Sequence, residues 1–522
     1  MTERQKVPRG ALSFILMAAG ILLLPTLFRL FAIGRFDLGN DEAHYYMYAV
    51  HPALSYFDHP LMVALLIRAG LDIFGTTAFG VRVFAPLLFL LSSLLLGMIA
   101  VLLAPRRRVL LWTLILVNAV PLFGYLGAML MLPDAPLSVF WLLYLLVAMV
   151  LFGRYERLAT KVRIQGWILL GFLFGLSLLS KYNGVLLAPA TFLVLAGNSG
   201  LRRLLRTPAP YLALLLGLLV ATPLFLWNLR NGGASFLFQA THGLGGIHFN
   251  WVHFYQMVFG QIGYLSPILF LVIVVVLWTL YRKGPDAAGL PVARDSVTLL
   301  MWFSLLPLLF FNLIGLLHPI LPHWPAMGYL GALPLVALVI ASRPKSVFFV
   351  WTVRGAWLGI AMALLVTLQL FFRPVVLPSR FPLWVDITND LFGYRRLSGF
   401  LTEEMARHPD RTTTPFFFSS EHFNTADEVA FYLARPYNTI CLSPEVTQFD
   451  FWTDPHSIIG KTGLFVSTDQ YRVDPALYYP KGTFDRVVPL PPVVILRRGR
   501  PARVFYVYWL IGFRRVPFRP HR

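Results

Sequence analysis

The run ALSFILMAAGILLLPTLFRLFAI at residues 11–33 decides the fold of this chain. It holds about 23 residues, the length that an α-helix needs to cross the hydrocarbon core of a bilayer. Similar runs recur along the sequence, in which 57% of the 522 residues are hydrophobic and only 13% are charged. The mean hydropathy of +0.68 is higher than a water-soluble protein of this length requires. The sequence therefore predicts a polytopic α-helical membrane protein.

The apolar runs and the basic clusters between them predict the topology. Lys and Arg gather on one side of the expected spans, as at 106–108 and 202–206, so we expect a cytoplasmic N-terminus. The net charge of +20 then reflects membrane orientation rather than nucleic-acid binding. The first run is too long for a signal peptide and is expected to stay as an uncleaved span. We expect about 11 transmembrane helices, at 11–33, 78–104, 109–128, 136–153, 165–181, 185–198, 209–228, 263–281, 296–317, 326–342 and 347–372.

The composition changes after Phe372, where the apolar runs become short. Segments such as TTPFFFSSE, EVAFYLARP and KTGLFVSTD suggest short buried strands joined by helices. The run VFYVYWLIGF at 504–513 is too short for a helical span and favours a strand. We therefore expect a transmembrane domain at 1–372, with a catalytic first external loop at 34–77, and a soluble periplasmic α/β domain at 373–522. The single cysteine, Cys441, excludes an intrachain disulfide.

The stretch DLGNDEAHYYMYAVHPALSYFDHPL at 37–61 concentrates ionisable groups directly after the first span, with four carboxylates and three histidines. Capping of a helix that starts near Asn40 explains Asp41 and Glu42 in structural terms. It does not explain Asp58 and His59, which also lie near the membrane surface. Ionisable groups at a hydrocarbon boundary are costly unless they serve a site, a pathway or an ion. We therefore favour a functional role for this loop.

Seven segments that cover most of residues 30–340 occur in a fixed order: NDEAHYY, SYFDHPLMVALLIRAG, FGVRVFAPL, MLPDAPLSVFW, LLSKYNGVLLAP, PLFLWNLRNGGASFLFQ and LPHWPAMGYL. Together they resemble glycosyltransferase family 39, a group of bacterial membrane enzymes of the GT-C fold. This group is related to protein O-mannosyltransferases and to the lipid A aminoarabinose transferase. The sequence departs from the aminoarabinose transferase type, which has arginine at the position of His44 and lysine at that of His59.

The resemblance implies transfer of a sugar from a polyprenyl-phosphate donor to an acceptor at the external face. It places Asp41 at the catalytic acidic position, with Glu42 beside it and Asp134 as a second external acid. Lys181, in SKY, matches a basic residue suited to a phosphate. The chemistry agrees, because glycosyl transfer needs a base for the acceptor proton and a cation for the departing phosphate. Snorkelling of Lys181 towards the headgroups is an equally simple interpretation.

Three further side chains join the candidate substrate-binding set with His59 and Lys181. Tyr45 lies beside the acidic pair, and His323, in LPHWP, is a candidate for the acceptor side, although a membrane-interface anchor explains its neighbour Trp324 equally well. Arg82 follows the first loop, and a salt bridge to a loop acid is its simpler role.

A divalent metal such as Zn²⁺, Mn²⁺ or Mg²⁺ is a possible cofactor. Asp58 and His59 fall in a pattern that the family associates with metal or donor-phosphate contact, and His242 is a candidate third ligand. These residues fit no compact metal-binding spacing. For His248 and His253, we favour an ordinary polar residue over a ligand.

We therefore expect a membrane glycosyltransferase of the bacterial inner membrane, inverting if it follows its relatives. Its expected partners are a polyprenyl-phosphate sugar, an envelope lipid, glycan or protein acceptor and membrane lipids, but no nucleic acid. Two other classes stay open. A transporter or flippase of lipid-linked sugars would place its charges near the bilayer midplane, often in two repeated halves. A non-catalytic scaffold for envelope assembly would explain the C-terminal domain but not the acidic loop.

Overall fold

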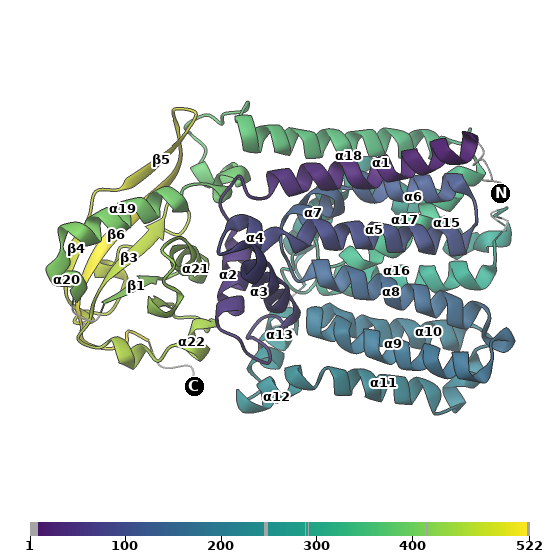
Figure 1. The fold of residues 1–522 in the computed structure, drawn as a ribbon, viewed down its shortest axis with the longest axis horizontal. Coiled ribbons are helices and arrows are strands. Elements are labelled where there is room, and N and C mark those ends of the chain that lie inside the picture. The colour runs from purple at the N-terminus through teal and green to yellow at the C-terminus, as the bar shows by residue number, and fades with distance from the viewer. Residues whose placement is uncertain (1–8, 245–248, 288, 291, 414–415, 519–522) are drawn as a thin grey trace, which may run out of the picture. The chain divides into compact units, whose positions relative to one another are not determined.

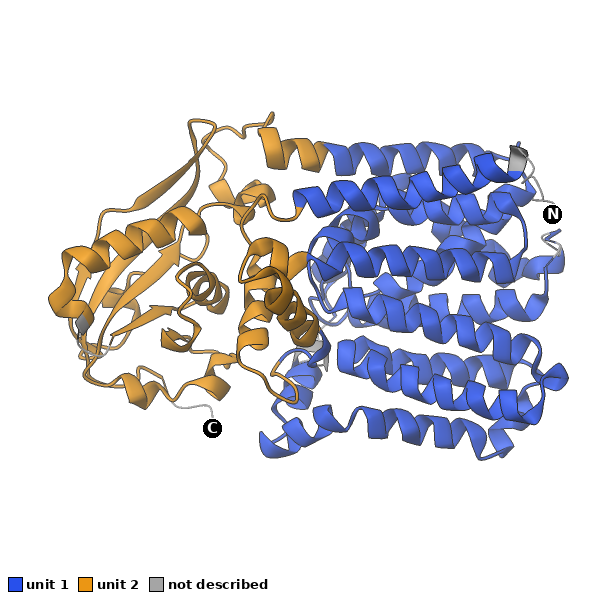
Figure 2. Cartoon of the chain, viewed as in Figure 1, with its two compact units in different colours: residues 1–32, 58–62, 83–364 blue, residues 33–57, 63–82, 365–522 orange. Residues whose placement is uncertain are grey.

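The chain forms two compact units, which Figure 2 colours separately. The structure is a computed structural model that describes residues 9–244, 249–287, 289–290, 292–413 and 416–518 (Figure 1). Unit 1 comprises residues 1–32, 58–62 and 83–364, and unit 2 comprises residues 33–57, 63–82 and 365–522. Most of the first loop after α1 therefore belongs to the same unit as the C-terminal residues.

Unit 1 is helical. Its helices follow one another through short connections, as the alternation of apolar runs and basic loops predicts. They are α1 (Arg9–Ala32), α5 (Phe84–Leu103), α6 (Arg107–Ala119), α7 (Gly127–Met129), α8 (Asp134–Gly153), α9 (Thr160–Ser180), α10 (Leu187–Gly197), α11 (Ala209–Val220), α12 (Thr222–Arg230), α13 (Ala234–Leu244), α14 (Trp251–Leu265), α15 (Pro267–Ala287), α16 (Arg294–Ile314), α17 (Ala326–Ser342) and most of α18 (Val347–Phe372).

Seven helices in the described part of the chain are long and apolar enough to cross a membrane, or up to nine if each bent pair is one span. The bent pairs are α6 with the segment up to α7, at 72°, and α11 with α12, at 54°. Two shorter apolar helices lie at 182–197 and 326–342. All eleven segments expected from the sequence contain helix, but eleven membrane crossings remain a prediction because helix length alone does not establish that the shorter ones cross.

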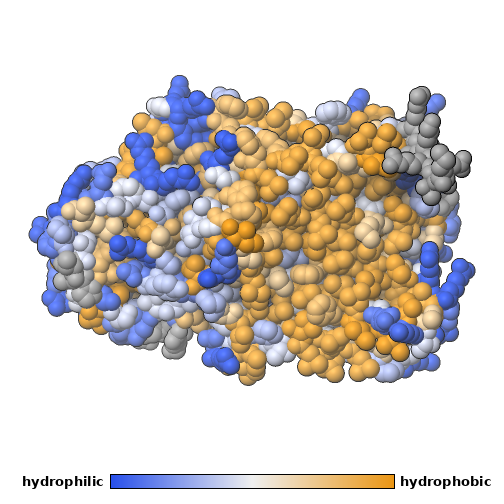
Figure 3. Space-filling model, in the orientation of Figure 1, coloured by the Kyte–Doolittle hydropathy of each residue, from blue (hydrophilic) through white to orange (hydrophobic). Residues whose placement is uncertain are grey.

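The helices of unit 1 present a nearly continuous apolar surface in Figure 3. In α1, for example, Leu16 is 63% exposed and Leu24 is 69% exposed. Such exposure would be unfavourable in water and is what contact with lipid tails requires. By contrast, α17 is buried along most of its length and forms the centre of the helical packing. The chain is a multi-pass membrane protein.

Unit 2 contains a mixed sheet. Among the described residues, the strand order is β2-β1-β3-β6-β4, and β5 also pairs with β6. The pairs of β1 with β2 and β3 are parallel, whereas β6 runs antiparallel to β3, β4 and β5. The strands are β1 (Phe416–Ser420), β2 (Thr439–Cys441), β3 (Thr462–Thr468), β4 (Phe484–Pro489), β5 (Val493–Arg497) and β6 (Arg500–Phe513). The helices of unit 2 are α2 (Asn40–Val50), α3 (Met62–Phe74), α4 (Ala78–Arg82), α19 (Tyr394–Arg407), α20 (Pro409–Thr413), α21 (Phe423–Tyr432), α22 (Phe449–Trp452) and α23 (Pro475–Tyr478).

Both faces of the sheet are covered, so successive strand residues enter different cores. Phe418 packs with Trp509 and Tyr394 on one face, while Phe417 packs with Phe513 on the other. The strand expected at 504–513 is confirmed as part of β6. The segment EVAFYLARP, expected among the strands, instead begins within α21. Its apolar residues recur at helical spacing and continue the helix that begins at Phe423. The short length of the apolar run did not reveal this helix.

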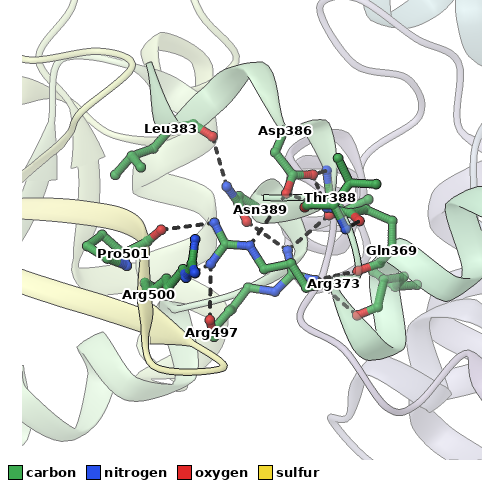
Figure 4. Close-up of polar contacts among 11 residues, drawn as sticks. Gln369, Arg373, Leu383, Asp386, Thr388, Asn389, Arg497, Arg500 and Pro501 are labelled. Carbon is green, nitrogen blue, oxygen red and sulfur yellow. Dashed lines mark hydrogen bonds and ion pairs between the residues drawn. The ribbon is translucent and has the colours of Figure 1, made fainter. Parts of the chain in front are cut away.

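The end of α18 is joined to the β5–β6 hairpin by two arginines (Figure 4). Nη2 of Arg497 donates to the carbonyl oxygens of Gln369 and Leu370, both at 3.0 Å, in the last turn of α18. In return, Nη2 of Arg373 donates to the carbonyl oxygen of Pro501 at 2.9 Å. Because carbonyls in the last turn of a helix lack intrahelical partners, Arg497 gives the Leu370 carbonyl a donor, and it adds a second bond to the Gln369 carbonyl, which also accepts from the backbone N–H of Arg373.

Candidate active site

Asp41, an exposed acid of the first loop, lies in the first turn of α2. The backbone N–H of Gly39 donates to Oε2 of Glu42 at 2.9 Å, so a side chain satisfies one of the donors at the start of the helix. Asp41 is exposed, whereas residues 42–49 are buried. The sequence thus builds a buried helix whose first turn presents one carboxylate outward.

Glu42 forms a buried ion pair with Arg82, which ends α4. Nη2 of Arg82 lies 2.6 Å from Oε2 of Glu42, and the two side chains are 0% and 1% exposed. The same guanidinium donates to the carbonyl oxygens of Ile33, Phe36 and Asp37. Five donors of one arginine therefore hold Glu42 and the segment that leads into α2. This arrangement fixes the position of the helix that carries the exposed acid.

The remaining face of α2 packs against α21 within unit 2. Nδ1 of His44 lies 2.7 Å from Oδ2 of Asp427, and its Nε2 lies 2.9 Å from the hydroxyl of Tyr48. Tyr45 is only 5% exposed and contacts the Tyr48 ring at 5.7 Å between centroids. Nδ1 of His44 thus holds α2 against α21, while Nε2 is engaged within α2.

A second acid–base cluster lies in unit 1. Asp134 is the first residue of α8, where the helix dipole favours a negative charge, and Lys181 directly follows the last residue of α9. Nζ of Lys181 lies 2.7 Å from Oδ2 of Asp134, and the side chains are 6% and 19% exposed. The sequence analysis proposed both residues, and the structure brings them together as an ion pair.

His59 and His323 belong electrostatically to the same cluster. Burial, followed by the positive charge of Lys181, lowers the pKa of His323 to about 4, with Asp134 opposing the shift and His59 adding to it. His323 is therefore neutral at neutral pH and has one ring nitrogen that donates and one that accepts.

A tight turn places Lys181 in this position. The chain leaves α9 in an extended conformation at Lys181 and continues as a 3₁₀ turn. A Cβ atom on Gly184 would lie 2.6 Å from the carbonyl carbon of Ser177, so the turn requires glycine there. Nδ2 of Asn183 donates to the carbonyl oxygen of Trp324 at 3.2 Å, which ties the SKYN turn to the LPHWP loop.

The metal site expected at Asp58 and His242 stays a prediction; among the described residues, no group of three or more His, Cys, Asp or Glu side chains could hold an ion. Asp58 is held through its backbone, since Nε2 of Gln239 donates to its carbonyl oxygen at 2.8 Å. His242 lies in α13, but its side chain falls outside the described part of the structure, as does all of His248. His253 contacts Asn250 at 3.4 Å. We therefore derive no chemical step through a metal.

Sequence reasoning missed a buried acid of α21. Glu428 is 0% exposed, and within the described chain neither of its carboxyl oxygens has a hydrogen-bond partner. Burial raises its pKa well above the usual range, the carboxylate of Asp37 adds to the shift, and Arg503 opposes it. A protonated Glu428 is the form that this environment favours.

Arg29, near the end of the first apolar run, was also missed. Its Nε and Nη2 donate to the carbonyl oxygen of Gly124, at 3.0 and 2.6 Å, and Nη2 also reaches Oδ1 of Asn118 at 3.0 Å. It therefore holds the bend between α6 and α7. An arginine inside a spanning run is a signal that could have identified it.

Comparison with known proteins gives a consistent picture. Residues 58–227 match the family described as dolichyl-phosphate-mannose-protein mannosyltransferase. The chain is 24% identical over 359 residues to the lipid A galacturonosyltransferase RgtD of Rhizobium johnstonii, a match that covers 66% of this chain and 68% of that protein.

Two solved proteins share the fold. The structure resembles ArnT from Cupriavidus metallidurans in the apo state, with a TM-score of 0.57, 18% identity and coverage of 95% of this chain and 98% of ArnT. ArnT bound to undecaprenyl phosphate gives the same TM-score of 0.57 at 17% identity, with coverage of 95% and 97%. The archaeal oligosaccharyltransferase AglB from Archaeoglobus fulgidus matches with a TM-score of 0.50 and 12% identity, over 87% of this chain and 68% of AglB. The likeness to ArnT extends over nearly the whole chain.

Proposed function

We propose that the chain is a family 39-like membrane glycosyltransferase of the GT-C fold, which transfers a sugar from a polyprenyl-phosphate donor to an envelope acceptor. The observation that carries the proposal is the buried pair of Lys181 and Asp134 at the ends of two membrane helices. A cation at this position suits the phosphate of a lipid whose chain lies in the bilayer. The likeness to an ArnT structure that holds undecaprenyl phosphate supports the same class of donor.

Lys181 and His59 stabilise the departing phosphate in this proposal. Among the described residues, Nζ of Lys181 donates only to Asp134, so two of its three N–H groups are available to phosphate oxygens. Asp134 orients Lys181, and the neutral His323 leaves the positive charge beside it undiminished. Stabilisation of charge that develops on the leaving group contributes most to such a reaction.

Asp41 acts as the base. Its carboxylate accepts the proton of the acceptor hydroxyl while that oxygen attacks the anomeric carbon of the donor sugar. The bond from that carbon to the phosphate oxygen breaks, and polyprenyl phosphate leaves with the bonding electron pair. A single displacement of this kind inverts the anomeric configuration.

The other proposed residues support these groups. Glu42, first proposed as catalytic, and Arg82, proposed to bind substrate, hold α2 as a saturated ion pair. Tyr45 packs in the same helix, and Asp58 precedes His59 in the chain. We propose a glycolipid as the acceptor class, because the similar RgtD is a lipid A galacturonosyltransferase.

The proposed topology follows the basic loops. The arginines of 106–108, at the start of α6, and those of 202–206, which precede α11, face the cytoplasm together with the N-terminus in this scheme. The first loop and the C-terminal domain then face the periplasm, where polyprenyl-linked sugars serve envelope acceptors.

Release of polyprenyl phosphate tests the proposal. Purified protein in nanodiscs receives a panel of polyprenyl-phosphate sugars and an extract of envelope lipids, and wild type is compared with Asp41→Asn. We expect the substitution to lower release about 100-fold or more, the usual contribution of a general base. Asp72→Asn is a matched control, because Asp72 is an exposed carboxylate, 58% accessible, in an ion pair with Arg68. Full activity in Asp41→Asn would refute the role of Asp41, and absence of release from every donor would favour a transporter.

A further inference from the structure

Two aromatic rings of unit 2 form a stack near the proposed base. His422 directly precedes α21, and Tyr471 follows β3. Their ring centroids lie 3.7 Å apart, and the ring planes differ by only 10°. Both side chains are partly exposed, and Tyr471 makes no other ring contact within the described chain. No second aromatic ring of the described chain stacks on the tyrosine, and its side chain keeps some access to solvent.

Three polar atoms on residues of the stack or within two positions of it in the chain lack hydrogen-bond partners among the described residues. They are Nδ1 of His422, Oδ1 of Asn424 and Oε1 of Gln470, all shielded from solvent. Asn424 is only 9% exposed, and Nε2 of Gln470 donates to the hydroxyl of Tyr471 at 3.2 Å. Buried polar atoms are nearly always satisfied, so a group of three around one stack points to a ligand that supplies the missing bonds.

The stack lies within electrostatic reach of Asp41. Burial raises the pKa of the Tyr471 phenol, and the carboxylates of Asp390 and Asp41 raise it further, with Arg503 opposing them. The first turn of α21 is also fixed to α2, because the Phe423 ring meets His44 edge-on at 4.9 Å. These contacts lie within one compact unit.

The chemistry of these groups selects a neutral, hydroxylated ring. Burial lowers the pKa of His422 to about 4, so the imidazole is neutral at neutral pH and offers one donor and one acceptor. Carboxamide oxygens accept hydrogen bonds from hydroxyls, and an aromatic face packs against the C–H face of a pyranose. The nearby carboxylates disfavour an anionic group.

We propose that His422, Asn424, Gln470 and Tyr471 form a subsite for a pyranose ring of the acceptor, which presents its hydroxyl to Asp41. This inference rests on the proposed function, since it names the part of the C-terminal domain that recognises the acceptor. The tyrosine supplies the stacking surface, and the three polar side chains hold the hydroxyls at the edge of the sugar.

Acceptor kinetics of Tyr471→Ala and Asn424→Ala test the subsite. With a saturating polyprenyl-phosphate sugar, we expect each variant to raise the KM for the acceptor about tenfold or more, while kcat and the donor KM stay within about threefold. Asn438→Ala is the control, because Asn438 is an exposed asparagine of the same unit. Unchanged acceptor KM in both variants would overturn the subsite, even where Asp41→Asn abolishes transfer.

A binding measurement makes the test independent of transfer. The probe is the glucosamine disaccharide of a lipid A headgroup, added to the full-length protein in nanodiscs and observed by saturation-transfer NMR. We expect saturation of its ring C–H protons by wild type and by Asp41→Asn, and loss of that signal in Tyr471→Ala. No signal with wild type, or equal signals with wild type and Tyr471→Ala, would refute the subsite without bearing on the donor reaction.

Discussion

Two buried ion pairs of this protein differ in how completely their hydrogen-bonding groups are used. The N–H groups of Arg82 donate to Glu42 and to three backbone carbonyls, whereas Lys181 donates only to Asp134 in the described chain. Glu42 is 1% exposed, but Asp134 is 19% exposed. A saturated, dry pair can only support structure. An unsaturated pair that borders an accessible space can also bind a ligand.

The difference also separates two kinds of charged residue near a membrane. Arg82 ends α4 and Lys181 directly follows α9, and the sequence around each residue suggests a functional role. Burial of two charges is costly unless every group is satisfied, so a fully bonded pair solves a structural problem. The remaining N–H groups of Lys181 have no acceptor in the described chain, which is unfavourable for a buried cation, and binding of an anion would supply acceptors.

Arg82→Met should have the largest effect, because it breaks the saturated pair. The substitution leaves Glu42 buried without its cation and three carbonyls without their donor. Loss of one partner of a buried pair costs about 3–5 kcal/mol of stability. We expect a large fall in the thermal midpoint in detergent and poor recovery of monodisperse protein.

Arg68→Met provides the matched control, because Arg68 and Asp72 form an exposed pair with side chains 55% and 58% accessible. An exposed pair contributes at most about 1 kcal/mol. A midpoint for Arg82→Met equal to that of Arg68→Met would contradict the structural role of the saturated pair.

Lys181→Met tests the unsaturated pair by activity rather than by folding. We expect polyprenyl-phosphate release to fall about 100-fold, as for loss of a group that stabilises developing negative charge. The thermal midpoint should fall less than in Arg82→Met, because Asp134 keeps some access to solvent. Lys181→Arg keeps the charge and should retain part of the activity. A variant that loses stability and activity together, as Arg82→Met does, would remove the distinction between the pairs.

Much of the fold could be predicted because bilayer thickness imposes a length on apolar runs. The eleven expected segments contain helix, and the strand at 504–513 is present. The number of crossings could not be settled in this way, because α10 and α17 are short and α6 and α11 end at bends. The segment at 428–436 was misjudged because a short apolar run suits a buried helix as well as a strand.

The site residues could be proposed singly, but their pairing could not. Asp134 and Lys181 stand 47 positions apart, and only helix packing brings them to 2.7 Å. His44 and Asp427 stand 383 positions apart, so no local pattern links them. Nor does sequence spacing tell a saturated arginine from a lysine with spare donors. Those properties depend on which backbone carbonyls the fold directs at each side chain.

Glu428→Gln tests a buried acid whose hydrogen-bonding groups are not used at all. Neither carboxyl oxygen of Glu428 has a hydrogen-bond partner in the described structure. Its pKa is raised well above the usual range by burial, so the folded state holds the proton more tightly than the unfolded state. Stability is thus fully present below the unfolded pKa and declines as pH rises towards the folded pKa. We expect the neutral glutamine to remove this decline, so that the variant gains stability over wild type between pH 5 and pH 8.

Thermal midpoints of wild type and Glu428→Gln across pH 5–8 give the measurement. Glu403→Gln is the control, since Glu403 lies on α19 of the same unit with its side chain 69% exposed. Parallel curves for wild type and Glu428→Gln would show that Glu428 is ionised in the folded protein.

His323→Gln should have the smallest effect on stability. The pH dependence that it removes has the opposite sign to that of Glu428. The pKa of His323 is lowered to about 4, chiefly by burial and then by the charge of Lys181, so the unfolded state binds the proton more tightly. Stability is therefore present above the unfolded pKa of about 6.5 and is lost as pH falls towards 4. Because His323 is only partly buried in the structure, we expect the substitution to remove about 1 kcal/mol of this acid loss. Thermal midpoints at pH 7 and pH 4.5 measure it. A wild-type curve as flat as that of the variant would mean that His323 is not held neutral beside Lys181, and a phosphate would then meet two cations in this cluster instead of one.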